Sequence, residues 1–236
     1  MNKKEAIPAI TRGQMREIDR LMMDGLGISF FMMAENAARE IARVARDQAG
    51  NGRRVLVLAG TGGNGGDGLI TARRLSGWGY EPRVILVGGR VRDEINILSS
   101  ILVKMKIFIQ SNSLGINELF AWADIIVDSL LGYGASGNPR GEMVKLIEMA
   151  NNSGKTIVSV DMPTGLDADT GAPAEFTIKA RHTVSIGLPK VGLLKDAASL
   201  YVGKLWLCDI GIPPSLYKEI GVEVGPIFRD DTLISI

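Results

Sequence analysis

The chain has 236 residues, which suits one large domain or two small ones. Its 27 basic and 26 acidic side chains give a net charge of +1, without the basic excess typical of proteins that bind nucleic acids or anionic membranes. One cysteine, Cys208, and one histidine, His182, exclude a disulfide scaffold and a metal site rich in either residue. The lone thiol and an N-terminus without the apolar core of a signal peptide lead us to expect a cytoplasmic protein.

Two amphipathic helices are predicted at the N-terminus, over residues 11–25 and 30–48. Thr11 and Gln14 form the pattern of a capping box at the start of the first helix. Met15, Ile18 and Met22 lie on one face of that helix and are expected to be buried.

Strands and helices alternate through the rest of the chain, and the strands are almost entirely apolar. This pattern predicts an α/β fold with a mostly parallel, twisted sheet covered on both faces, a three-layer αβα arrangement with the two N-terminal helices packed on it. We expect a single domain over residues 1–236, with an irregular edge where the last two strands follow one another without a clear helix. Strands are predicted at 53–60, 82–88, 106–110, 124–132, 156–163, 182–188 and 204–211, and helices at 67–79, 92–105, 117–123 and 141–154.

A glycine cluster follows the first predicted strand. Gly60, Gly62 and Gly65 fit G-x-G-x-x-G between a strand and a helix, the context of a dinucleotide-binding loop. Glu81 lies roughly where such a fold places the acid that binds the ribose. Taken alone, the pattern predicts an NAD-dependent dehydrogenase.

Asn64 and Asp67 do not fit a plain copy of that loop, because a carboxylate beside a diphosphate repels it. Asp67 is therefore expected to face elsewhere, capping the following helix or binding a ribose hydroxyl or a cation. The alternative is a tight turn that only packs the helix on the sheet.

Other polar residues follow later strands and are expected at the same edge of the sheet, because ligands of open α/β sheets bind beyond the carboxyl ends of the strands. They are Asp128, Asp161 and Lys190. Structural alternatives remain open: Asp128 and Asp161 could cap a turn, and Lys190 could be a solvated loop residue. The segment from Asp167 to Gly171 has the start of a calcium loop but lacks its final glutamate, so we interpret it as a turn.

Five stretches resemble the NAD(P)H-hydrate epimerase family, the YjeF N-terminal domain. They read "AGTGGNGGDGLITARRL", "VDSLLGYGASG", "VDMPTGLDADTG", "IGLPKVGLL" and "DIGIP", in the order and at the spacing of the family. The resemblance implies a Rossmann-like fold, often a homodimer, that interconverts the R and S forms of hydrated NADH and NADPH in metabolite repair. A separate ADP- or ATP-dependent dehydratase then repairs the S form. It also implies a bound potassium ion.

The resemblance also assigns residues. Asp161 corresponds to a catalytic acid that also contacts substrate, and Asn64, Asp128 and Thr164 correspond to the potassium ligands. Gly63 stands where the family usually has asparagine, which puts one substrate hydrogen bond in doubt. The implied substrate-binding residues are Gly63, Asn64, Gly65, Gly66, Asp67, Gly132, Tyr133, Gly134, Ala135, Ser136, Gly137 and Asn138.

The hypothesis for catalysis is general acid–base work by Asp161. The carbon that bears the hydroxyl also bears the ring nitrogen, so loss of the hydroxyl gives a planar iminium that water can attack from either face. Asp161 would protonate the leaving hydroxyl, which requires burial to favour its protonated form. Two alternatives stay open: an ordinary NAD-dependent oxidoreductase, for which only Tyr133 is a candidate, and a non-catalytic nucleotide-binding or dimerising scaffold.

Overall fold

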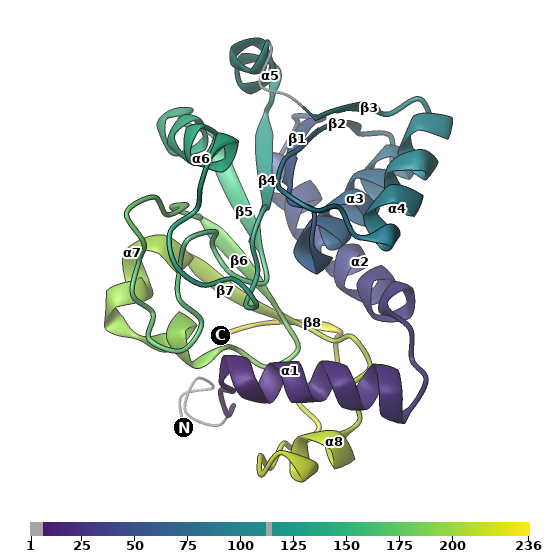
Figure 1. Ribbon diagram of the computed structural model, residues 1–236, viewed down its shortest axis with the longest axis vertical. Coiled ribbons are helices and arrows are strands. Elements are labelled where there is room, and N and C mark those ends of the chain that lie inside the picture. The colour runs from purple at the N-terminus through teal and green to yellow at the C-terminus, as the bar shows by residue number, and fades with distance from the viewer. Residues whose placement is uncertain (1–6, 112–114) are drawn as a thin grey trace.

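The computed structural model describes residues 7–111 and 115–236. Within them eight strands form one sheet in the order β3-β2-β1-β4-β5-β6-β7-β8 (Figure 1). Every neighbouring pair is parallel except β7 and β8, which are antiparallel. The strands are β1 (Arg54–Ala59), β2 (Glu81–Leu86), β3 (Phe108–Gln110), β4 (Ile125–Ser129), β5 (Thr156–Val160), β6 (His182–Ile186), β7 (Lys204–Cys208) and β8 (Leu233–Ser235).

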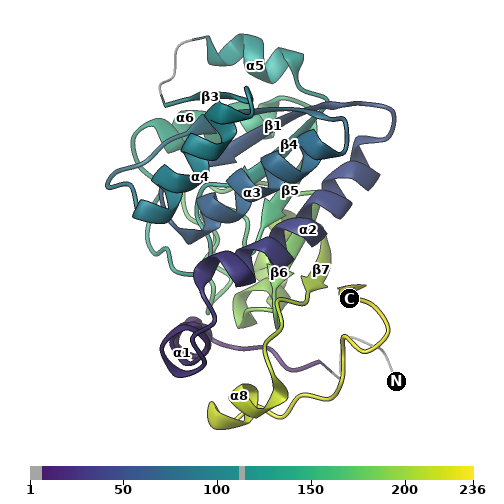
Figure 2. The same cartoon turned by 90° about the vertical axis from the view of Figure 1, so that its right-hand side faces the viewer.

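Helices cover both faces of this sheet, which confirms the predicted αβα layers. Val55 and Val57 of β1 belong to the cluster packed under α2, α3 and α4, whereas Leu56 and Leu58 belong to the cluster under α5 and α6. Because side chains alternate across a strand, a strand that is apolar throughout needs cover on both sides. Figure 2 shows α2, α3 and α4 side by side on one face. The helices are α1 (Arg12–Arg20), α2 (Phe30–Ala49), α3 (Gly63–Gly77), α4 (Asp93–Lys104), α5 (Ile116–Trp122), α6 (Glu142–Asn152), α7 (Ser199–Val202) and α8 (Pro214–Glu219).

The strand order reverses between β1 and β4. From β1 the chain builds outward to β2 and β3, and it then returns to the other side of β1 with β4, β5, β6 and β7. Loops that leave adjacent strands in opposite directions open a crevice at such a point. The glycine loop after β1 and the loop after β4 border this crevice.

The N-terminal segment lies across one end of the sheet (Figure 1). The predicted capping box is present, and Met15, Ile18 and Met22 are buried as expected. The helix ends in a π-helical turn over Leu21–Gly25. Upstream of it, Ile10 forms a parallel bridge with Lys190, so the start of the chain holds the loop after β6 in place.

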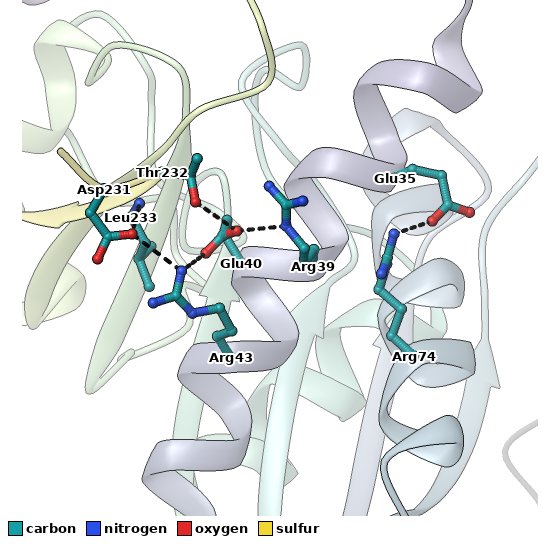
Figure 3. A network of polar contacts seen from close by, with 8 residues as sticks. All are labelled: Glu35, Arg39, Glu40, Arg43, Arg74, Asp231, Thr232 and Leu233. Atoms are coloured by element: carbon teal, nitrogen blue, oxygen red, sulfur yellow. Dashed lines mark hydrogen bonds and ion pairs between the residues drawn. The ribbon is translucent and has the colours of Figure 1, made fainter. Parts of the chain in front are cut away.

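Charged residues on α2 fix this helix against its neighbours (Figure 3). Glu40 is fully buried and accepts hydrogen bonds from Arg39 at 2.8 Å, Arg43 at 2.7 Å and Thr232 at 3.1 Å. Glu35 is bonded at 2.5 Å by an arginine of α3, Arg74. These contacts join the central helix to α3 and to the segment before β8, and α2 then forms one wall of the site.

The far edge of the sheet is irregular, as predicted. Between β6 and β7 the chain forms two short 3-10 turns, Val191–Leu194 and Asp196–Ala198, and the four residues of α7 in place of a full helix. The sequence analysis missed α8 and β8. Within the described residues, no helix has the length and apolar character needed to cross a membrane.

Candidate active site

One cavity of about 420 Å³ lies at the switch point. The loops after β1, β4 and β5 form its floor, and residues of α1 and α2, including Met15, Met33 and Ala37, form an apolar wall. Several residues assigned from the resemblance line it: Gly63, Asn64, Asp67, Gly132, Tyr133, Gly134, Ala135 and Asp161.

Asp161, directly after β5, has the most unusual backbone in the site. Its φ is +64°, in the left-handed region that non-glycine residues rarely adopt, and only 2% of the residue is exposed. The conformation is held by a 2.7 Å bond from its amide to the carbonyl of Val184. Its Oδ2 accepts a 2.9 Å hydrogen bond from the amide of Tyr133. Backbone strain of this kind is typical of functional residues, because the surrounding structure must stabilise it.

Lys190 is the partner of Asp161. The lysine is fully buried, and its Nζ lies 2.5 Å from Asp161 Oδ1 and 2.8 Å from the carbonyl of Ile186. The alternative of a solvated loop lysine is therefore wrong. Lys190 does not line the cavity, whereas the carboxyl group that it contacts does.

Asp128, at the end of β4, is also fully buried but has no cationic partner among the described residues. Its carboxylate accepts hydrogen bonds from Ser159 Oγ at 2.7 Å, Thr164 N at 2.9 Å and Thr164 Oγ1 at 2.6 Å. Burial nevertheless raises the pKa of Asp128. The turn-capping alternative is therefore partly correct for Asp128, because its carboxylate accepts hydrogen bonds from Thr164 in the turn that follows Asp161.

Asn64 differs from Asp128 because its side-chain amide has no hydrogen-bond partner among the described residues. Its Nδ2 and Oδ1 are buried, and no residue in the described part of the chain hydrogen-bonds to either atom. A Cβ added to Gly132 would lie 3.0 Å from Asn64 Oδ1 and 3.1 Å from Asp161 Oδ2. Asn64 and Asp161 therefore meet across Gly132, and a side chain at that position would crowd both.

These observations fit the potassium ion that the resemblance implies. Asn64 offers a buried oxygen without a donor, and Asp128 offers a buried negative charge without a protein cation. Hard cations take oxygen ligands, and Asn64, Asp128 and Thr164 carry amide, carboxylate and hydroxyl oxygens.

The glycine loop differs from its prediction in where the helix begins. α3 starts at Gly63, so Asn64 to Asp67 lie in its first turns, and Asp67 does not cap the helix. Two glycines are explained by packing: a Cβ on Gly60 would lie 2.0 Å from the carbonyl oxygen of Leu130, and one on Gly65 would lie 1.7 Å from that of Gly60. The packing alternative thus accounts for part of the cluster, whereas Gly63 borders the cavity.

Asp67 reaches the cavity from inside α3. It is 6% exposed, and no described residue donates a hydrogen bond to its carboxyl group. Burial, reinforced by the nearby carboxylates of Asp161 and Asp19, raises the pKa of Asp67 well above its ordinary value. The protonated form of Asp67 is therefore favoured, and it does not repel an anionic ligand as an ionised group would.

The remaining assigned residues are divided. Ser136, Gly137 and Asn138 line a smaller hollow of about 130 Å³ next to the main cavity. Gly65 and Gly66 are buried behind the loop and line neither. Glu81 opens β2 at the amino edge of the sheet, so its expected role at the ribose is wrong. The predicted turn at Asp167 is confirmed: its side chain accepts from the amide of Thr170 at 2.9 Å.

The sequence analysis missed Asp19 of α1 and Arg92 at the start of α4, which both line the cavity. Asp19 accepts a 2.5 Å hydrogen bond from the hydroxyl of Tyr133, and burial raises the pKa of both groups. A signal for Asp19 was available, because it lies four residues after the buried Met15 and so near the same helix face. Arg92 carried no such signal.

Comparisons with known proteins show the family and the fold. The chain is 37% identical over 224 residues to NAD(P)H-hydrate epimerase of Dehalogenimonas lykanthroporepellens, covering 93% of this chain and 88% of that protein. It is 36% identical over 225 residues to the bifunctional NAD(P)H-hydrate repair enzyme Nnr of Pyrobaculum aerophilum, covering 92% of this chain and 44% of that protein. The crystal structure of yeast YNL200c superposes with a TM-score of 0.83 at 25% identity, covering 98% and 100% of the two chains. Residues 31–192 match the family described as YjeF-related protein N-terminus, and the chain belongs to that family.

Proposed function

We propose that this protein is an NAD(P)H-hydrate epimerase, an isomerase that interconverts the R and S forms of hydrated NADH and NADPH in coenzyme repair. Its similarity to curated epimerases extends over about nine-tenths of the chain. The observation that carries the proposal is Asp161, a strained, buried carboxylate that lines the cavity of about 420 Å³ and is paired with Lys190.

The reaction needs one proton to move twice. Departure of the hydroxyl as water leaves a planar iminium, and water entering from the opposite face restores the hydrate with inverted configuration. The ammonium of Lys190 lies 2.5 Å from Asp161 Oδ1 and holds the carboxyl group in place beside the cavity. Asp161 passes a proton to the leaving hydroxyl and takes one from the entering water, whereas Lys190, outside the cavity, positions it.

The other assigned residues bind the substrate or the potassium ion. In this proposal Gly63, Asn64, Asp67 and the loop from Gly132 to Asn138 contact the substrate along the cavity and the smaller hollow beside it, and Gly65 and Gly66 shape the loop from behind. Asn64, Asp128 and Thr164 would hold a potassium ion, which supplies positive charge among the buried carboxylates. The unpartnered amide of Asn64 supports this arrangement.

The proposal also covers a partner enzyme, the location in the cell and the oligomeric state. The bifunctional relatives, which are about twice the length of their match to this chain, suggest that the S form is passed to an ADP- or ATP-dependent dehydratase. We further propose that residues 1–236 act as one epimerase domain, in the cytoplasm and as a homodimer. Light scattering of the purified protein tests the dimer.

A chromatographic assay of the two epimers tests the function. Purified R-hydrate of NADH or NADPH is incubated with the protein, with potassium present or replaced by a large organic cation. Equilibration of R and S far above the background rate is expected, and the rate should fall without potassium. Background rates in both buffers would contradict the proposal. Rates far above background that do not change without potassium would contradict only the role of the metal.

A further inference from the structure

Arg92 stands apart from the other charged residues around the main cavity. Among the described residues that line it, three are acidic, namely Asp19, Asp67 and Asp161, and Arg92 is the single basic one. The substrate of the proposed function carries a diphosphate, and Arg92 is the charged side chain of this lining that attracts it. We therefore expect the basic side chain in this lining to serve binding and not only the stability of the fold.

The position of Arg92 is set by the glycine loop. Its amide donates a hydrogen bond of 3.4 Å to the carbonyl of Thr61, which ties the segment after β2 to the loop after β1. Its Nη1 lies 3.6 Å from where a Cβ of Gly63 would be, and its guanidinium lies 5.8 Å from the ring centre of Phe30. Because Gly63 has no side chain, the guanidinium has room beside the first turn of α3.

Among the described residues, the side-chain contacts of Arg92 with Phe30 and Glu94 are weak. The ion pair with Glu94 spans 3.5 Å, and both side chains are partly exposed, 48% for Arg92 and 30% for Glu94, so the pair contributes little. The first turn of α3 presents backbone amides and the positive end of a helix dipole, and Gly62 supplies no side-chain cap. A guanidinium beside that end is unfavourable until an anion lies between them.

A second observation concerns the same turn. The buried amide of Asn64, one residue after Gly63, has no hydrogen-bond partner among the described residues. Arg92 and the amino end of α3 supply positive charge to a cavity whose other charged side chains among the described residues are acidic, which suits a substrate whose phosphates lie beside Arg92 while its reactive ring reaches Asp161.

We propose that Arg92 binds a phosphate group of the dinucleotide substrate beside the first turn of α3. The inference rests on the proposed function, since it takes the substrate to be a hydrated dinucleotide. Guanidinium–phosphate hydrogen bonds are charge-assisted and directional, so Arg92 fixes the position of the substrate and takes no part in proton transfer.

The test compares Arg92→Ala, Arg92→Lys and a matched control, Arg90→Ala. Arg90 lies in the same segment and is exposed, but it does not line the cavity. Binding of ADP-ribose is measured by calorimetry, and kcat and KM are measured with hydrated NADH and hydrated NADPH. For Arg92→Ala we expect KM to rise about tenfold to hundredfold, the loss of one charge-assisted contact, with kcat within about threefold of the wild type. Arg92→Lys should lie between, and Arg90→Ala should match the wild type.

The pattern of losses identifies the phosphate. Equal increases in KM for the two hydrates, with weakened binding of ADP-ribose, assign Arg92 to the diphosphate. An increase for hydrated NADPH alone, with ADP-ribose binding unchanged, assigns it to the 2′-phosphate. Unchanged KM for both hydrates in an active enzyme overturns the inference. A wild type inactive on both hydrates contradicts the proposed function, and the ADP-ribose comparison then decides on Arg92 separately.

Discussion

Two buried aspartates at the ends of neighbouring strands are stabilised in different ways. Asp161 follows β5, has a strained backbone and is paired with the ammonium of Lys190. Asp128 lies at the end of β4, has ordinary strand geometry and, among the described residues, accepts hydrogen bonds from neutral donors of Ser159, Thr164 and Leu130. The first carries its own counter-charge, and the second does not.

The difference separates two roles. A carboxyl group that borders the cavity and is held by an internal cation is placed to exchange a proton with substrate. A buried carboxylate with neutral donors alone is costly to ionise, so it favours either a proton or a cation from solution. We interpret Asp161 as the group that transfers protons and Asp128 as part of a cation site.

Asp161→Asn should have the largest effect. It removes the proton-transferring group while keeping the shape of the side chain, so kcat should fall by about 10²–10⁴. Epimerisation is measured by chromatography, and ADP-ribose binding serves as the control for an intact cavity. Turnover at the wild-type level would exclude Asp161 from catalysis.

Lys190→Met should break the ion pair and leave a buried carboxylate alone. The free energy of unfolding is expected to fall by about 3–5 kcal/mol, as for other broken buried pairs. The double variant Lys190→Met/Asp161→Asn should lose less than the sum of the single losses, because no unpaired charge remains. Urea denaturation measures all four proteins, and strictly additive losses would show that the pair is not coupled.

Thr164→Val should affect the other aspartate. It removes the hydroxyl that bonds Asp128 at 2.6 Å, so we expect a loss of about 1–3 kcal/mol in stability and a weaker response of activity to potassium. Thr183→Val is the matched control, because Thr183 bonds the carbonyl of Val202 at 2.7 Å and does not line the cavity. Thr183→Val should lose a similar amount of stability, but its activity should respond to potassium as the wild type does. If both variants respond to potassium equally, Thr164 is not a ligand of the cation.

Asp67→Asn should change stability in a way that depends on pH, with the smallest gain at the acid end of the range. Because the pKa of Asp67 is raised in the folded state, its contribution to stability is full below its ordinary pKa and is lost as pH rises through the folded value. The asparagine variant lacks this loss, so it should gain on the wild type as pH rises, by up to about 1.4 kcal/mol per pH unit. Urea denaturation from pH 5 to pH 8 measures the difference, and a constant difference would contradict the raised pKa.

Much of the scaffold could be predicted because it rests on local patterns. Apolar strands between helices predicted the covered parallel sheet, and Thr11 with Gln14 predicted the first helix. α8 and β8 were missed because they are short, six and three residues, and β8 depends on pairing with β7. The start of α3 was placed late because glycines are poor helix formers, and here their lack of side chains permits close packing.

The sequence by itself determined which polar residues end the strands, since the carboxyl ends of parallel strands share one edge whatever the details of packing. Only the tertiary structure decided their partners. Lys190 is 29 positions from Asp161, Tyr133 is 114 from Asp19, and the loop of Arg92 meets the glycine loop through Thr61. Such contacts join separate loops, and the burial that shifts the pKa of buried groups such as Asp19 and Tyr133 is not encoded by any local pattern.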